Sequence, residues 1–175
     1  MSVMLASWAL GGILVACGSV AGYHGDGQLI DNGSSAATDR YILDLGPVSL
    51  AKKSAAHFRI AGLPSEVFVV GLQLASENGA RQRLDTSATS AEVSIQITDQ
   101  QSNVVVRIAG PLPTWTWSAS TGGNEAFVYG GYGANASFRP EAKKGPYMVK
   151  IAVLEPDPRA QDINARLLLK AGGWK

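Results

Sequence analysis

Few residue types in this chain could carry catalysis. The body of the chain has one histidine, His57, and the sequence holds neither a G-x-S-x-G nor an H-E-x-x-H motif. A hydrolase needs a nucleophile, a base and an orienting acid. In the extended stretch 56–61, His57 and Arg59 fall on the face opposite Phe58 and Ile60, so we expect both to point to solvent or to a sheet edge. The sequence therefore predicts no catalytic set and no enzyme.

A second candidate site is aromatic. Trp115 and Trp117 are two residues apart and would share one side of an extended segment, and Tyr129 and Tyr132 follow within a glycine-rich stretch. Flat rings beside glycine loops can stack on the apolar faces of sugars, while polar groups at the rim set the orientation. The alternative is that the tryptophans close one end of the core, and the sequence favours this alternative.

Charged residues offer weaker candidates. Arg81 and Arg83 lie in the polar run 76–91, a long connection of a kind that is usually functional or mobile in compact domains. The acids of the segment EPDPRAQD fit no EF-hand spacing, so we expect a solvated turn there. His24 has no second ligand at a metal-binding spacing. We therefore expect no metal site and no cofactor.

Composition limits the partners that the chain could bind. The 175 residues are 46% hydrophobic and 17% charged, which is typical of a folded globular chain. Fifteen Lys and Arg stand against 14 Asp and Glu, and no stretch concentrates one sign, so nucleic-acid binding is disfavoured. The single cysteine excludes an internal disulfide and a cysteine-based zinc cluster.

The elements that must position these residues are strands. Over residues 40–175, apolar and polar residues alternate with a period of two, and short clusters rich in Gly, Pro, Asn and Asp separate the segments. Connections this short cannot hold helical crossovers, so we expect about eight strands in a two-sheet antiparallel β-sandwich. The expected core stripes are Tyr41/Leu43/Leu45, Phe58/Ile60, Phe68/Val70/Leu72/Leu74, Val93/Ile95/Ile97, Val104/Val106/Ile108, Tyr147/Val149/Ile151/Val153 and Leu167/Leu169.

The first residues suggest a cellular location. Residues 3–14 form an uncharged apolar run that is too short to span a membrane and suits the h-region of a signal peptide. The run ends in Leu14-Val15-Ala16-Cys17, which resembles the lipobox of bacterial lipoproteins at all four positions. The resemblance implies a signal peptide at 1–16 and a lipidated Cys17 that anchors the mature chain to a membrane. The absence of Lys and Arg from residues 1–16 departs from the family pattern.

Two further expectations concern the lipid anchor. Gly18 follows the cysteine where inner-membrane lipoproteins carry an aspartate, so the resemblance implies an outer-membrane lipoprotein that faces the periplasm. Residues 18–39 are rich in Gly, Ser and Asp, and we expect them to be a flexible tether between Cys17 and the sandwich.

With an anchor, a β-sheet body and no catalytic set, the sequence favours noncovalent binding to another envelope protein. Accessory lipoproteins of secretion systems and immunity lipoproteins are similar at the level of architecture only. The candidate surface residues are Trp115, Trp117, Tyr129, Tyr132, Arg81, Arg83, His57 and Arg59. A carbohydrate- or peptidoglycan-binding module that uses Trp115 and Trp117 is the alternative, and a hydrolase centred on His57 is a distant third.

Overall fold

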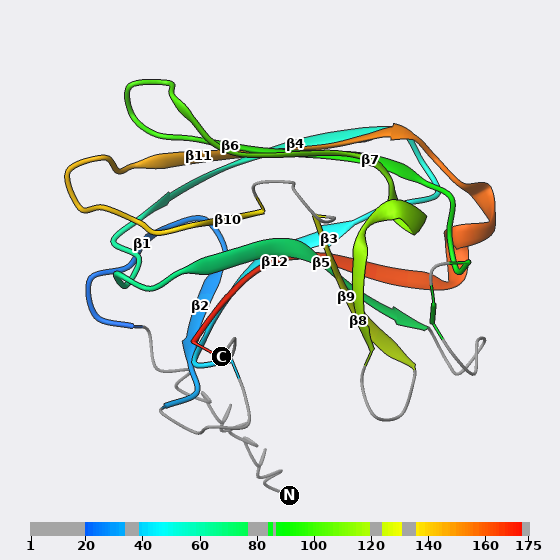
Figure 1. Ribbon diagram of the computed structural model, residues 1–175, viewed down its shortest axis with the longest axis horizontal. Coiled ribbons are helices and arrows are strands. Elements are labelled where there is room, and N and C mark those ends of the chain that lie inside the picture. The colour runs from blue at the N-terminus through cyan, green and yellow to red at the C-terminus, as the bar shows by residue number, and fades with distance from the viewer. Residues whose placement is uncertain are drawn as a thin grey trace, which may run out of the picture.

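Two antiparallel β-sheets lie face to face in this protein and form a β-sandwich (Figure 1). The structure, a computed structural model, describes residues 20–33, 39–76, 84–85, 87–119, 124–130 and 136–172. The fold class expected from the alternating pattern is confirmed. Eight of the strands in the described residues are five residues or longer, which agrees with the expected number.

The first sheet has five strands in the order β1-β4-β11-β6-β7. All neighbouring strands are antiparallel. The register of the two central pairs is regular until a bulge near Val153, and β7 carries a second bulge opposite Ile97 and Thr98. The strands are β1 (His24–Gly25), β4 (Ser54–Ala61), β11 (Tyr147–Glu155), β6 (Glu92–Thr98) and β7 (Val104–Pro111).

The second sheet has seven strands, six of them in the order β2-β3-β12-β5-β9-β8, and β10 pairs with the first two residues of β5. In Figure 1 this sheet arches, and β2 and the β8–β9 hairpin bend away from the five-stranded sheet. The strands are β2 (Gln28–Asp31), β3 (Tyr41–Val48), β5 (Phe68–Ser76), β8 (Thr116–Ala119), β9 (Glu125–Tyr129), β10 (Ser137–Phe138) and β12 (Ile163–Ala171).

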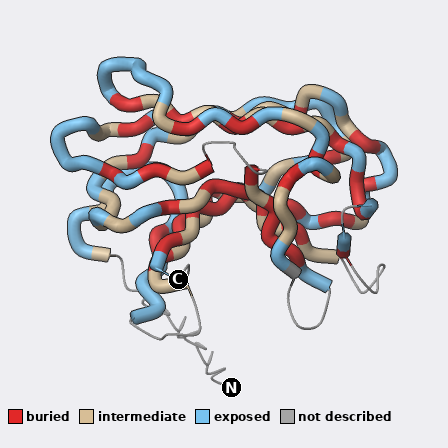
Figure 2. Tube along the Cα trace, in the orientation of Figure 1, coloured by how far each residue is buried: buried red, intermediate tan, exposed pale blue. Residues whose placement is uncertain are grey.

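The core fills the space between the two sheets, and the burial colours of Figure 2 alternate along most strands. Successive side chains of a strand point to opposite faces, so every second residue enters the core. The alternation is clearest in β6, where Val93, Ile95 and Ile97 are fully buried between half-buried polar residues. The expected stripes are confirmed except at Val104, which is 44% exposed, and Phe58, which is only half-buried.

The expected tether is wrong where residues 18–39 are described. Residues 24–25 pair with β4 and residues 28–31 pair with β3, and Leu29 is only 4% exposed. These strands are two and four residues long, too short for a periodic pattern to stand out among Gly, Asp and Asn. The described part of this stretch therefore belongs to the sandwich, where it forms an edge strand of each sheet. Cys17 and residues 34–38 lie outside the described residues.

The expectation of a polar connection over residues 76–91 is also partly wrong, because the second half of this segment reaches the core. Leu84 is 1% exposed, and Ala88 and Ala91 are buried. The described residues also include two short 3₁₀ helices, η2 (Leu112–Thr114) and η3 (Pro158–Asp162). In the part of the chain that the structure describes, no helix has the length and apolar character needed to cross a membrane.

Candidate functional site

The outward face of the five-stranded sheet carries a row of basic side chains. The register places His57 of β4 beside Lys150 of β11, followed by Gln96 of β6 and Arg107 of β7. Directly paired residues project to the same face of a sheet, so these four side chains form a line across four strands. The three basic residues are exposed, as is Arg59, two residues beyond His57. We call the surface made by His57, Arg59, Lys150 and Arg107 the cationic face.

The rows on either side of this line are neutral apart from Arg59. One row pairs Arg59 with Met148, Thr98 and Val104, and the other pairs Ala55 with Ala152, Ser94 and Ala109. The carboxylates on these strands are Glu92 and Glu155, which lie opposite each other at one end of the sheet, and at the edge the Asp26 carboxylate accepts the backbone N–H of Arg59. No ion pair joins the cationic face to a carboxylate among the described residues.

The cationic face is flat and of modest size. Neighbouring strands are about 4.8 Å apart, so β4 and β7 are separated by about 14 Å. Two exposed apolar side chains flank the charges, Met148 at 36% and Val104 at 44% exposure. A face of this kind can attract an acidic surface and add a small apolar contact. Neither the hollow beside Tyr147 nor the hollow beside Val48 lies on this face.

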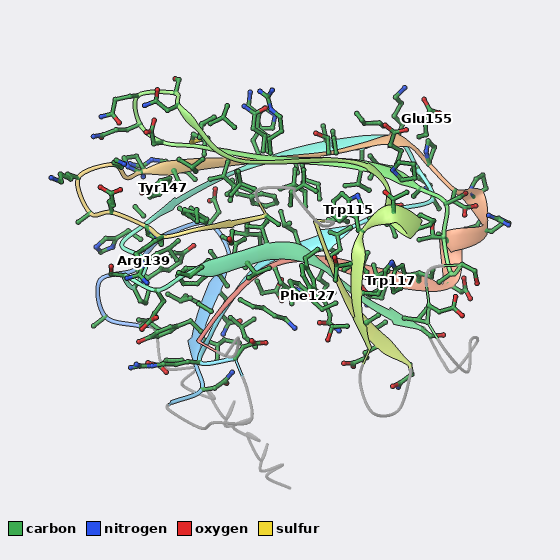
Figure 3. All side chains as sticks on the ribbon, in the orientation of Figure 1. Trp115, Trp117, Phe127, Arg139, Tyr147 and Glu155 are labelled. Atoms are coloured by element: carbon green, nitrogen blue, oxygen red, sulfur yellow. The ribbon has the colours of Figure 1, made fainter. Side chains whose placement is uncertain are left out.

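The tryptophans do not form an exposed platform, which is the interpretation that the sequence disfavours. Trp115 is 5% exposed and belongs to the core between the sheets, and Trp117 is half-buried against the same core (Figure 3). The indole N–H of Trp117 donates to the carbonyl of Leu112 at 3.2 Å. Tyr129 is paired with Thr116, and paired residues share a face of the sheet. Trp117 is the next residue after Thr116, so it points to the opposite face from Tyr129. The core alternative is therefore the correct one for Trp115.

Tyr129 instead belongs to a cluster on the outer face of the seven-stranded sheet. Its ring stacks on Phe127 with the centroids 5.6 Å apart, and Lys170 Nζ lies 4.3 Å from the Phe127 centroid. Lys170 Nζ also donates to Gln73 Oε1 at 3.1 Å and lies 3.7 Å from a carboxylate oxygen of Asp39. Burial lowers the pKa of Lys170, and the nearby Asp39 carboxylate opposes that change. With its ammonium group surrounded in this way, Lys170 holds β12, β5 and β9 together.

A second polar cluster forms where a solvated turn is expected. Asp157 is 4% exposed, so that expectation is wrong for this residue. Its carboxylate accepts hydrogen bonds from Ser90 N and Oγ and from Arg159 N and Nε, at 2.8 to 3.0 Å. The Arg159 guanidinium and these backbone N–H groups hold the pKa of Asp157 well below its usual range. The cluster fastens residues 87–91 to η3, and the described residues contain no group of three metal-binding side chains.

The structure thus brings together only part of the expected site. His57 and Arg59 lie on one surface as expected, and Lys150 and Arg107 join them from distant parts of the chain. The sequence signal that could have found them is the position of each charge between two core residues of a strand. Arg81, Arg83, Tyr132 and Cys17 lie outside the described residues.

Comparison with known proteins gives a structural likeness. No family model matches the chain, and no curated protein matches it. A crystal structure of a protein from Sulfurospirillum deleyianum is similar at a TM-score of 0.47 with 11% sequence identity, and the match covers 74% of this chain and 96% of the other.

Proposed function

We propose that this chain is a lipid-anchored binding protein of the bacterial cell envelope, and that its cationic face docks on an acidic surface of another envelope protein. The observation that carries the proposal is the row of basic side chains across four strands without an intervening carboxylate. Lys150 lies diagonally across from Arg59, and like charges at neighbouring positions of a sheet are destabilising. An acidic partner would remove that repulsion when it binds.

The surroundings of the charges favour a protein over a membrane surface as the partner. Segments that bind anionic lipid headgroups usually cluster several Lys and Arg side by side. Here Gln96 lies between Lys150 and Arg107, and Gln96 and its neighbours Thr98 and Ser94 on β6 can exchange hydrogen bonds with a protein surface. Met148 and Val104 supply the apolar contact that a protein interface commonly has near its centre.

The other two functions expected from the sequence gain no support. A sugar platform needs an accessible ring face, and Trp115 has its ring in the core. A hydrolase centred on His57 needs an orienting acid beside the imidazole. The neighbour of His57 across the strands is Lys150, which is a cation.

Site-specific photocrosslinking in the native host tests the proposal. A photoreactive amino acid replaces Gln96 or Met148, both of which lie on the outward face of the sheet. We expect a reproducible protein adduct from these two positions. The double change Lys150→Glu and Arg107→Glu should abolish the adduct, because it reverses two of the three Lys and Arg charges that attract the partner.

A matched variant controls for net charge. Arg139→Glu with Lys143→Glu changes the charge by the same amount and lies outside the cationic face, on exposed residues near β10. This variant should keep the adduct. A photoreactive residue at Ser118, which is exposed on the other sheet, should give none. Crosslinking to lipid alone, or an adduct that survives the Lys150→Glu and Arg107→Glu change, would contradict the proposal.

The lipid anchor has a separate test. Radiolabelled palmitate should enter the wild-type chain and should not enter Cys17→Ser, because the thiol is the acylated atom in the resemblance to lipoproteins. Equal labelling of the two chains would remove the anchor from the proposal. The docking experiment would still stand, because it depends on the sheet and not on the N-terminus.

A further inference from the structure

The edge strand β1 covers only one end of β4. It pairs with the last two residues of β4, Ile60 and Ala61. Asp26 adds one more step to this ladder. Its N–H donates to the carbonyl of Arg59 at 2.8 Å, and its carboxylate accepts the N–H of Arg59 at 2.7 Å. The carboxylate therefore replaces the backbone carbonyl that a continuing strand would have offered.

The chain then leaves the five-stranded sheet at Gly27. This glycine has a φ of +82°, and a Cβ on it would lie 2.3 Å from the carbonyl oxygen of Asp44 in β3. Only glycine fits this conformation and this close approach. The chain continues as β2 beside β3, in the other sheet. The edge of β4 from Ser54 to Phe58 is left without a neighbouring strand among the described residues.

The uncovered part of the edge presents backbone groups to solvent. The N–H and C=O of Arg59 both point away from β11, since both bond to Asp26. The direction of these groups repeats every second residue of a strand, so the N–H and C=O of His57 and Ala55 point the same way. Both residues are exposed, and neither backbone has a hydrogen-bond partner on that side among the described residues.

An apolar hollow opens beside this edge. It has a volume of about 150 Å³ and lies where β4 passes the end of β3. Its walls include Pro47, Val48, Ala56, Ile151 and Val153. A residue added opposite Ala56 would point to the same face as Ala56, which is toward this hollow. Residues added opposite His57 or Ala55 would point outward, to the side of the cationic face.

We propose that the free edge of β4 accepts an extended segment of a partner protein in which acidic and small apolar residues alternate. Backbone hydrogen bonds to Ala55 and His57 would hold the segment, as in other cases of strand addition. Its apolar side chains would enter the hollow, and its acidic side chains would lie beside His57 and close to Lys53. This mode of binding goes beyond docking on the cationic face, because it depends on backbone groups and on a hollow at the edge.

Charge argues against a second copy of the chain at this edge. Two β4 strands that paired around Ala56 would place Ala55 opposite His57 and Lys53 opposite Arg59, since antiparallel partners keep a constant sum of residue numbers. The second pairing sets two cations against each other, which is unfavourable, and Asp26 already occupies the backbone groups of Arg59. An acidic segment avoids this repulsion, so charge complementarity selects it over self-association.

Peptide binding to the full chain tests the proposal. The probes are fluorescent octapeptides in which Asp or Glu alternates with Val or Ala, and the comparison set carries Lys in place of the acids. Anisotropy should show saturable binding of the acidic set and much weaker binding of the Lys set. On binding, the amide protons of Ala55 and His57 should become protected from hydrogen exchange, because they enter a new ladder.

Two variants separate backbone pairing from side-chain attraction. His57→Pro removes an N–H that points to the open edge, where proline is tolerated, and should weaken binding about tenfold. His57→Ala keeps the N–H and should weaken binding much less. Ala56→Leu, which fills the hollow from within, should also weaken binding. Equal binding to wild type and His57→Pro, equal binding of the Lys set, or a concentration-dependent dimer that His57→Pro abolishes would overturn the proposal.

Discussion

Lys170 lies directly over Phe127, with its Nζ atom 4.3 Å from the centroid of the ring. The two residues come from β12 and β9, which are separated in the sheet by β5. Their contact therefore spans three strands on the outer face of the seven-stranded sheet. The side chain of Lys170 is only 14% exposed, and its pKa is lowered mainly by burial. A charged group held in this way makes stability depend on pH.

The first prediction concerns that dependence. The pKa of Lys170 is lower in the folded chain than its ordinary value of 10.5 in the unfolded chain, so the folded state releases the proton first as pH rises. Between these two pKa values the unfolded chain binds more protons, and the free energy of unfolding increases with pH. Lys170→Met should remove this increase. Urea unfolding at several pH values up to 10.5 measures it, and an unchanged profile in the variant would refute it.

The second prediction concerns Asp157. Its folded pKa lies below the ordinary value of 3.8, so its stabilising effect is present above that value and is lost as pH falls. At pH 7, Asp157→Ala should lower the free energy of unfolding by about 3 kcal/mol, because Ser90 and the start of η3 lose a charged acceptor. Asp157→Asn keeps the shape and should cost less. Urea unfolding of both variants checks the order, and a cost under about 0.5 kcal/mol for Asp157→Ala would contradict it.

The third prediction concerns Trp115. Its ring is in the core, and its indole N–H has no hydrogen-bond partner among the described residues. Trp115→Ala should cost about 3–5 kcal/mol by leaving a cavity. Trp115→Phe keeps most of the ring volume and removes the unpaired N–H, so it should cost much less. Thermal unfolding measures these costs. Acrylamide quenching checks the burial of the ring, because Trp115→Phe should remove the component of the emission that acrylamide quenches least.

Quenching also bears on the sugar-binding alternative. If glycan fragments shift the fluorescence of the wild type but not of Trp115→Phe, the ring is accessible and its assignment to the core is wrong. Trp117 is the matched position, since it is half-buried at the same edge. We expect its emission to be quenched more readily than that of Trp115.

The architecture could be predicted from sequence because the signal for each strand is local. Alternation such as Val93, Ile95 and Ile97 occupies a single segment and needs no knowledge of its neighbours. The strands at 24–25 and 28–31 have no such local signal. Each is defined by its pairing partner in a different part of the chain, and only Leu29 is buried within them. No window of such short segments shows a period.

The candidate surface was only partly predictable. The outward direction of His57 and Arg59 follows from their positions beside Phe58 and Ile60. That Lys150 lies next to His57 follows from strand pairing across 93 residues of sequence, which no local pattern encodes. The same holds for Asp157, whose surroundings include Ser90 from a distant loop.

The last prediction separates binding from folding on the cationic face. Lys150 lies between His57 and Gln96 and has no ion-pair partner among the described residues. Lys150→Glu would place a carboxylate beside His57 and within reach of Arg59, and opposite charges at neighbouring positions stabilise a sheet by about 0.2–1 kcal/mol. The variant should therefore unfold at a slightly higher urea concentration than the wild type, and added salt should reduce the difference. Residues retained for binding are often unfavourable for stability, and the loss of the photocrosslinked adduct in a chain that is more stable would show that Lys150 is such a residue. A variant that loses both stability and the adduct would show instead that Lys150 supports the fold.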